Sequence, residues 1–504
     1  MNEPYETLRA EFAAWEELAE RMIPLIGRLF REQGIVPSLH GRRLLQLSPQ
    51  QILATHRTTR RVGDEVLDPE KTMAVLEALA ALRPGPASVD IARLVEIHDE
   101  RGGSYDDASL AAFLRAELVD VVDARPSAPT DVVIYGFGRI GRLVARILLA
   151  HQTTGSGLRL RAIVVRDLAE GDLEKRASLL RRDSVHGPFA GTIEVDEERG
   201  ALIANGALVQ VITAASPEEA DYASRGIRDA IVADTTGRWR DRDGLARHLE
   251  APGTARVLLT APGKGDIENI VFGVNDERID GGDRILSAAS CTTNAITPVL
   301  AALDEAFVVE RGHVETVHSY TNDQNLIDNF HRGERRGRSA ALNMVITETG
   351  AARAVAKALP QLRGRLTGSA IRVPTPDVSL AILNLRLRRE TTKDEINAFL
   401  RRTSRHAPLR QQIDFSESPE AVSSDFVGST RAGVVDGLAT IAEGGRDVVL
   451  YVWYDNEYGY SCQVVRVLER MAGAHPTVLP LRRAVALDDA IADELADEAR
   501  AALA

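Results

Sequence analysis

Cysteine is nearly absent from this chain of 504 residues, which contains only Cys291 and Cys462, far apart in the sequence. Two distant cysteines do not make a disulfide framework. Their scarcity favours a reducing compartment, and we expect a cytoplasmic protein. Long apolar runs are also missing, since none approaches the ~18 residues of a membrane-spanning helix. The amino terminus, MNEPYETLRAEF, has no apolar signal core, so neither export nor a membrane partner is expected.

Net positive charge is lacking as well. Lysine and arginine number 61 against 73 aspartate and glutamate residues, which gives a formal net charge of −12. This acidic balance argues against a nucleic-acid partner and against an anionic membrane surface. It leaves room for a small anionic substrate, because such a ligand needs only a local cluster of positive groups.

The first 129 residues carry apolar side chains at helical spacing. The pattern predicts helices over residues 6–29, 69–82, 91–99 and 105–122. Breaks rich in proline fall at 83–86 and 125–130, and the hydrophobic pattern changes after the second. We therefore predict an all-helical N-terminal extension over residues 1–129.

After residue 130 the chain alternates short apolar runs with helical segments. Runs at 131–136, 158–165, 230–235 and 255–261 are typical of buried parallel strands, and they predict an α/β fold with a Rossmann domain over residues 130–290. Runs at 314–321 and 378–389 alternate like antiparallel strands, which predicts a mixed α+β domain over 291–454. Residues 475–504 are expected to form an acidic, helical C-terminal tail.

Three glycines, Gly136, Gly138 and Gly141, follow the first of these strands with the spacing G-x-G-x-x-G. Alone the motif is weak, but here it links an apolar strand to an amphipathic helix, the context that dinucleotide binding requires. The helix amino end then offers N–H groups and a partial positive charge to a pyrophosphate. Asp167 ends the second strand, where an acidic residue would hold a ribose hydroxyl. A glycine turn without a ligand is the alternative.

Cys291 lies in SAASCTTN, at a predicted strand-to-helix junction with Ser290 as a candidate N-cap. A cysteine at a helix amino end experiences a positive potential that lowers its pKa. His318, on a predicted strand, is a candidate base. The simpler interpretation is a buried structural thiol and an ordinary polar histidine, and Pro298 is expected to interrupt the helix. Spacing alone supports no more than a suspected cysteine–histidine pair.

Six segments occur in the order found in one enzyme family: GFGRIGR (136–142), ASCTTN (289–294), HSYTNDQ (318–324), RRGR (335–338), RVPTPDVS (372–379) and WYDNEYGYS (453–461). From the first segment to about residue 472, the chain resembles the phosphorylating glyceraldehyde-3-phosphate dehydrogenases. The resemblance does not cover the extension or the tail. By family habit, residues 455–474 close the Rossmann domain, and residues 291–454 are the catalytic domain.

The resemblance implies a covalent mechanism. Cys291 would attack the substrate aldehyde, and His318 would act as general base and stabilise the oxyanion. Hydride transfer to NAD would leave a thioester that inorganic phosphate cleaves to an acyl phosphate. The expected partners are therefore glyceraldehyde 3-phosphate and inorganic phosphate, with no metal, in a homotetramer.

The resemblance also assigns binding residues. For the substrate's own phosphate these are Thr321, Arg335 and Arg372, and for the attacking phosphate Ser290, Thr292, Thr349 and Gly350. Arg139 and Ile140 match residues whose backbone meets the pyrophosphate, and Asp167 matches the ribose acid. Thr260 and Asn456 match residues near the nicotinamide, with Tyr460 beside them. Outside the family, Arg335 could belong to a solvated basic run, Thr260 could simply bond backbone, and Tyr460 could be a core aromatic.

Several alternatives remain open. Asp167 favours NAD because a carboxylate repels a 2′-phosphate, but Asn329 and Phe330 replace a leucine–proline pair that many bacterial members carry near the adenosine, so NADP is not excluded. The same scaffold also serves erythrose-4-phosphate dehydrogenase, which ends in hydrolysis. A regulatory or interaction protein that retains the scaffold is a third hypothesis. For the extension, a structural wrap or a subunit interface is the simplest role.

Overall fold

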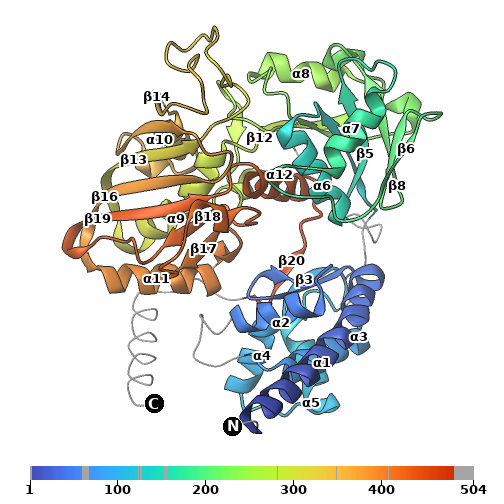
Figure 1. Ribbon diagram of the computed structural model, residues 1–504, viewed down its shortest axis with the longest axis vertical. Coiled ribbons are helices and arrows are strands. Elements are labelled where there is room, and N and C mark those ends of the chain that lie inside the picture. The colour runs from blue at the N-terminus through green and yellow to red at the C-terminus, as the bar shows by residue number, and fades with distance from the viewer. Residues whose placement is uncertain are drawn as a thin grey trace.

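The computed structural model describes residues 3–58, 67–122, 124, 128–151, 157–280, 282–347, 349–406 and 408–481. Its strands form three sheets of nine, seven and four strands. Figure 1 shows the two larger sheets side by side as a body, with the N-terminal residues packed below them as a separate lobe. The predicted Rossmann and mixed α+β folds correspond to the two larger sheets.

The nine-stranded sheet has the order β11-β12-β10-β9-β4-β5-β8-β7-β6. Its elements are β4 (Thr130–Tyr135), α6 (Arg139–His151), β5 (Leu158–Val165), α7 (Asp172–Arg181), β6 (Ile193–Asp196), β7 (Ala201–Ala204), β8 (Ala207–Thr213), β9 (Ala230–Asp234), α8 (Arg242–Glu250), β10 (Thr254–Leu259), β11 (Glu268–Asn269) and β12 (Ile285–Ser287). Because β4 pairs in parallel with β5 on one side and β9 on the other, the strand order reverses beside it. A crevice at such a reversal is the usual ligand site of an open parallel sheet.

The seven-stranded sheet has the order β14-β15-β13-β16-β19-β18-β17. Its elements are α9 (Cys291–Phe307), β13 (Val309–Ser319), β14 (Val345–Thr347), α10 (Ala351–Ala358), β15 (Leu366–Val373), β16 (Ser379–Thr392), α11 (Lys393–His406), β17 (Ile413–Ser416), β18 (Gly433–Asp436) and β19 (Glu443–Tyr454). The long strands β13, β16 and β19 pair antiparallel, as their alternating pattern predicts. Helix α9 continues through Pro298 to Phe307, so the expected interruption at this proline is wrong.

The sequence pattern predicts an all-helical extension. This prediction is wrong, because the extension also contains a sheet. Its elements are α1 (Glu3–Gln33), β1 (Ile35–Leu39), β2 (Arg42–Arg43), α2 (Pro49–Thr58), α3 (Pro69–Leu82), β3 (Ala87–Asp90), α4 (Ile91–Glu100) and α5 (Asp107–Glu117). The sheet order is β2-β1-β3-β20. Strands of two to five residues are too short to show a period of two, which is why the sequence pattern misses them.

The fourth strand of this small sheet comes from the other end of the chain. After α12 (Tyr458–Met471), which packs on α6 as the predicted closing helix, β20 (Thr477–Leu479) pairs in parallel with β3. Figure 1 shows this red strand lying beside blue β3. Leu479 is fully buried in the hydrophobic core of the extension. The tail is therefore not purely helical, and its remaining residues, 482–504, lie outside the described part of the chain.

Candidate active site

Cys291 is the first residue of α9, and the sequence around it explains that position. Ser290 is the N-cap, in extended conformation, and its Oγ accepts a hydrogen bond from Thr293 N at 3.0 Å. Ala289 has a φ of 58°, so a sharp turn leads from β12 into the helix. The predicted cap is confirmed, and the thiol lies at the amino end of a 17-residue helix.

His318 is buried near the end of β13 and faces the thiol. Its Nε2 lies 3.5 Å from Cys291 Sγ, so the structure brings the suspected pair together. The Nδ1 atom lies 2.7 Å from the carbonyl oxygen of Ser319 and donates to it when it carries the ring proton. That tautomer leaves the Nε2 lone pair free to accept the thiol proton.

The protonation states differ from the sequence-based expectation. Burial raises the pKa of the Cys291 thiol, while the nearby Arg372 guanidinium opposes that rise. Burial, together with Arg372, lowers the pKa of His318 to about 3. The amino end of α9 therefore does not lower the pKa of the Cys291 thiol below its usual value. Desolvation of the buried thiol raises this pKa by more than the helix end lowers it. Without ligands, the pair is a neutral thiol beside a neutral imidazole that can act as its base.

Arg372 joins this pair because β13 and β15 run parallel with His318 opposite Arg372. Its Nη1 lies 2.8 Å from His318 Nδ1 and donates to Ser319 O at 2.9 Å and to Thr321 Oγ1 at 3.4 Å. Thr321 also donates to Asp323. Arg372 and Thr321, both named from the sequence, thus converge beside the thiol.

Arg335 is not part of this cluster. Its side chain is exposed, whereas the next residue, Arg336, forms an ion pair with Asp323 at 2.9 Å. Arg336 also contributes to the lowered pKa of His318. Within a run of four residues that includes three arginines, the sequence does not distinguish which side chain turns inward, and Arg336 is the one it misses.

The remaining residues named for phosphate lie at helix amino ends. Ser290 Oγ is 2.7 Å from Thr293 Oγ1, and Thr292 Oγ1 is 2.9 Å from the buried hydroxyl of Tyr454. Gly350 is the N-cap of α10, and Thr349 Oγ1 accepts from Ala351 N at 3.1 Å. Helix α10 packs against α9. Two helix amino ends are available for an anion here.

The glycine loop has the geometry of a dinucleotide cradle. Gly136 has a φ of 98°, and a Cβ there would lie 2.9 Å from Thr236 Cγ2. A Cβ on Gly141 would lie 2.6 Å from Gly136 O, whereas one on Gly138 would meet nothing within 4 Å. The first and third glycines thus allow the turn and close packing, and the second faces open space, as backbone approach to a pyrophosphate requires.

The other residues named for the cofactor occupy strand ends or helix starts. Asp167 is exposed two residues after β5, and Ile140 packs on the sheet core. Thr260 donates to Asp234 O at 3.1 Å, and Asn456 Oδ1 accepts from Ser379 Oγ at 2.7 Å. Tyr460, which is in the core, donates to Ala289 O at 3.0 Å, next to the N-cap of α9.

Sequence reasoning misses a buried network that joins the two large domains. Arg139 forms ion pairs with Glu457 and with Asp183, in the second case at 2.5 Å. His186 Nε2 lies 3.3 Å from Glu457 Oε2 and 3.5 Å from Asp377 Oδ2. Burial and Asp455 raise the pKa of Asp377. Among the described residues, His186, Asp377 and Asp455 place ligand atoms within 4.8 Å of one another, close enough to hold a metal ion.

Thr235 is a second residue that sequence reasoning misses. Its hydroxyl donates to Gly136 O at 2.9 Å and holds the glycine loop against the end of β9. The signal was available, because β9 is predicted as a buried strand and its carboxyl end must lie beside the loop that follows β4.

A glycine-loop Rossmann domain joined to a domain that presents a cysteine–histidine pair defines a nicotinamide-dependent dehydrogenase that works through a thiol. Comparison with known proteins narrows this class. The model of the glyceraldehyde 3-phosphate dehydrogenase NAD-binding domain matches residues 130–242, and that of the C-terminal domain matches residues 290–456. The chain belongs to the glyceraldehyde-3-phosphate dehydrogenase family, and NAD is its cofactor.

Individual relatives show how far the similarity extends. A "glyceraldehyde-3-phosphate dehydrogenase-like protein" of Pseudomonas aeruginosa is 58% identical over 466 residues, 91% of this chain and 100% of the relative. A glyceraldehyde-3-phosphate dehydrogenase of Zymomonas mobilis is 39% identical, covering 68% of this chain and 98% of the relative. One from Bacillus subtilis is 40% identical, covering 66% and 96%. No helix in the described part of the chain is both long and apolar enough to cross a membrane.

Proposed function

We propose that this protein is an active phosphorylating glyceraldehyde-3-phosphate dehydrogenase, which oxidises an aldehyde phosphate to an acyl phosphate. The observation that carries the proposal is the 3.5 Å approach of Cys291 Sγ to His318 Nε2, with Arg372 beside the imidazole. A structural cysteine would need neither a base nor a guanidinium group at this distance.

The first step is capture of the aldehyde. His318 Nε2 accepts the Cys291 proton as sulfur bonds to the carbonyl carbon, and then gives that proton to the resulting alkoxide oxygen, which completes the hemithioacetal. This order suits a pair that is neutral before substrate binds, because the base acts during the attack. Arg372 then favours the developing negative charge on sulfur or oxygen.

The second step removes hydride from the hemithioacetal and leaves a thioester on Cys291. Bound NAD would supply the hydride acceptor for this step. His318 takes the hydroxyl proton as the carbonyl re-forms. On the protein side, Gly138 leaves room for the pyrophosphate and Asp167 is exposed to accept ribose hydroxyls.

The third step transfers the acyl group to inorganic phosphate, whose oxygen forms the new bond as the Cys291 thiolate leaves. We assign Arg372 and Thr321 to the substrate's own phosphate, with Arg336 rather than Arg335 as the second guanidinium. The amino ends of α9 and α10, with Ser290, Thr292, Thr349 and Gly350, are assigned to the attacking phosphate. Their support is the position of these residues at two helix amino ends, where N–H groups and a partial positive charge favour an anion.

We further propose that the protein is a cytoplasmic homotetramer. Support comes from the segment around β14, where six large apolar side chains are exposed in the single chain: Leu326, Ile327, Phe330, Leu342, Met344 and Ile346. A cluster of this kind is costly in water and marks an interface. Light scattering should give a mass of four chains, and Phe330→Asp should lower it. A monomeric mass for the wild type would contradict the assembly.

An activity assay tests the proposed reaction. Purified full-length protein is given glyceraldehyde 3-phosphate with NAD or NADP, with and without inorganic phosphate. We expect sustained reduction of NAD only when phosphate is present, and slower reduction of NADP. Sustained turnover without phosphate, or a preference for erythrose 4-phosphate, would contradict the proposal. Arg363→Ala, an exposed arginine before β15, is the control and should behave as wild type.

A further inference from the structure

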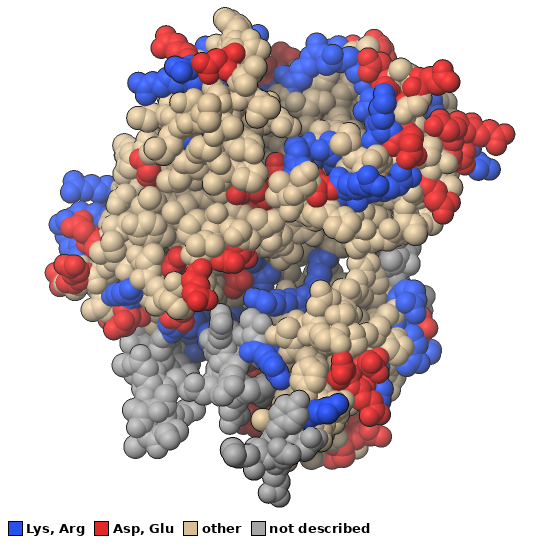
Figure 2. Space-filling model, in the orientation of Figure 1, with Lys and Arg blue, Asp and Glu red and all other residues tan. Residues whose placement is uncertain are grey.

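A large cavity lies where the extension meets the body. Its volume is about 1400 Å³, and its walls come from α1, the β1–β2 turn, α11, α12 and the residues around 410–431. In Figure 2 basic side chains are visible in the hollow between the lower lobe and the body. A space of this volume exceeds that of most drug-sized ligand pockets, which occupy roughly 300–1,000 Å³.

The charge of the cavity is opposite to that of the whole chain. Eight arginines line it against five carboxylates, although the chain has a net charge of −12. The carboxylates already have partners. Asp90 accepts from His40 N and Gly41 N at 2.9 and 2.8 Å, Glu417 pairs with Arg401, and Glu469 pairs with His475 at 2.9 Å.

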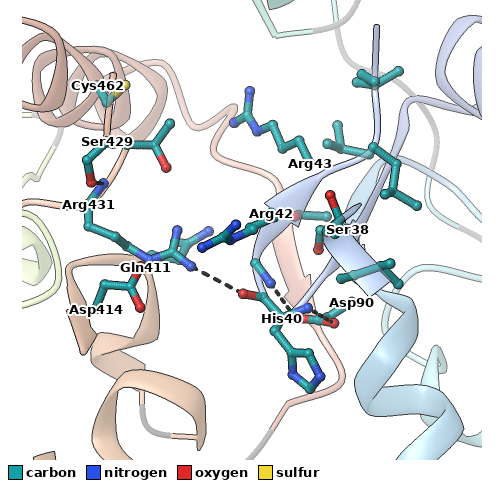
Figure 3. Close-up of a pocket in the computed structure, with 18 of the residues that line it drawn as sticks. Ser38, His40, Arg42, Arg43, Asp90, Gln411, Asp414, Ser429, Arg431 and Cys462 are labelled. Atoms are coloured by element: carbon teal, nitrogen blue, oxygen red, sulfur yellow. Dashed lines mark hydrogen bonds between the residues drawn. The ribbon is translucent and has the colours of Figure 1, made fainter. Parts of the chain in front are cut away.

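Four of these arginines, Arg42, Arg43, Arg431 and Arg466, form no ion pair with a carboxylate of any described residue. Arg466 donates to Thr430 O at 3.1 Å and Gln463 Oε1 at 2.8 Å, both neutral, and Arg43 contacts the His151 ring. Arg42 is exposed on the two-residue strand β2. Figure 3 shows Arg42 and Arg431 directed toward each other across the cavity, with Arg43 above them.

Arg431 is the most informative of the four. It is 9% exposed, and its buried Nε has no hydrogen-bond partner. Its Nη2 reaches the extension, donating to His40 O at 3.5 Å, and a Cβ on Gly41 would lie 2.3 Å from that nitrogen. A guanidinium group with an unpaired buried nitrogen is costly unless an anion pairs with it.

The four groups also repel one another. The pKa of Arg466 is lowered to about 10, chiefly by burial, and the positive charges of Arg431 and Arg43 contribute to this lowering. Like charges held together in a partly enclosed space destabilise the docked arrangement. A bound anion would neutralise this repulsion and link the arginines of the extension to those of the body.

We propose that this cavity is a binding site for a small phosphate ester that carries several negative charges on an organic body, held by Arg42, Arg43, Arg431 and Arg466. Arginine matches phosphate through paired, parallel hydrogen bonds. The apolar wall formed by side chains such as Ile23, Ile147 and Val434 would accommodate the organic part. The site is separate from the catalytic thiol, because Cys291 does not line the cavity.

Helix α12 connects the cavity with the active site. Cys462 and Arg466 of this helix line the cavity, whereas Tyr460, on the same helix, donates to Ala289 O beside the cap of the catalytic helix. The residue before α12 is Glu457, which pairs with Arg139, the first residue of α6 after the Gly136–Gly138 turn. A ligand that shifts α12 would therefore change catalysis, as an effector does.

Thermal unfolding of the full chain tests the site. The protein is first saturated with NAD and inorganic phosphate, so that the cofactor and catalytic phosphate sites are filled. ATP, pyrophosphate, adenosine and citrate are then added separately. We expect ATP to raise Tm by roughly 3 °C or more at saturation, pyrophosphate to raise it less, and adenosine to leave it unchanged. Isothermal titration with ATP under the same conditions gives the affinity.

Two variants and one control localise the binding. Arg42→Glu and Arg431→Ala should each weaken ATP binding at least tenfold, and Arg363→Ala, which does not line the cavity, should not. If Arg431→Ala fails to fold, Arg42→Glu decides, because the Arg42 side chain is exposed. No Tm rise with either ATP or pyrophosphate, an equal rise with adenosine, an equal rise with citrate, or unchanged ATP affinity in Arg42→Glu would each overturn the proposal.

Discussion

The site around Cys291 and the cavity below it handle polar groups in opposite ways. Around the thiol, Thr292 is bonded to Tyr454, Asn456 to Ser379 and the imidazole to a backbone carbonyl. In the cavity, four arginines have no carboxylate partner among the described residues. The hydroxyl, amide and imidazole groups of the first arrangement are paired within the protein, although the buried Nε of Arg372 is not, whereas the second arrangement leaves several positive charges without a carboxylate.

This difference reflects how each region is built. The catalytic groups are held by long strands and the ends of buried helices, which fix their geometry before substrate arrives. The cavity lies between the core of the nine-stranded sheet and the core of the extension, and the extension is closed by a strand from the far end of the chain. An enzyme site needs fixed groups, whereas a site between two lobes can respond to what binds.

The largest effect should come from Cys291→Ser. A hydroxyl has a much higher pKa than a thiol, so His318 cannot activate it, and turnover should fall by ~10³-fold or more. Steady-state NADH formation measures this, and Tm should stay within about 2 °C of wild type. If the serine variant kept wild-type turnover, Cys291 would not be the nucleophile, and the region around it would not be the catalytic site.

His318→Gln should have the next largest effect. Loss of a general base costs typically 10²–10⁴-fold, and here the buried thiol depends on that base because its own pKa is raised. His313→Gln, five residues earlier on the same strand and hydrogen-bonded to Thr367 and Ser369, is the matched control. If the two variants lose equal activity, the effect belongs to the strand and not to the base.

Leu479→Ala tests the packing of the extension, which forms one side of the cavity. This side chain is fully buried in the extension, so truncation should destabilise that core by about 2–5 kcal/mol. Leu481→Ala, two residues later and 65% exposed, should change stability by less than about 0.5 kcal/mol. Chemical unfolding measures both. Equal stability of the two variants would mean that β20 does not complete the extension.

A smaller effect is expected for Arg372→Ala on the reactivity of Cys291. Because Arg372 opposes the raised thiol pKa, its removal should raise that pKa further, and alkylation by iodoacetamide at pH 8 should slow about tenfold. In the wild type the rate should still climb between pH 7 and 9, since the thiol is mainly protonated there. A wild-type rate already on a plateau at pH 7 would show a preformed thiolate instead.

The body is far more predictable from sequence than the extension. Buried parallel strands such as β5 and β9 contain short apolar runs, AIVV and AIVA, and the residues that follow them must meet at one sheet edge, so the positions of the glycine loop and Asp167 in the fold can be predicted. The extension's strands are too short for a periodic pattern. The pairing of β20 with β3 joins opposite ends of the chain, and no local signal encodes it.

The candidate site shows where sequence reasoning stops. Cys291, His318 and Arg372 could be named because motifs mark them, and the structure places them in contact. The choice between Arg335 and Arg336 depends on how one turn packs, and the thiol pKa depends on desolvation. Both are properties of the folded chain. Arg42, Arg43, Arg431 and Arg466 of the cavity come from three distant segments and belong to no motif.

The most direct test of the central claim is to trap the acyl enzyme. Full-length protein is mixed with NAD and glyceraldehyde 3-phosphate without inorganic phosphate, then quenched in acid and digested for mass spectrometry. We predict one NADH per active site and an acyl group on the peptide that contains Cys291, which disappears when phosphate is added before the quench. NADH formation with no acyl group on Cys291, or with an acyl group elsewhere, would contradict the account.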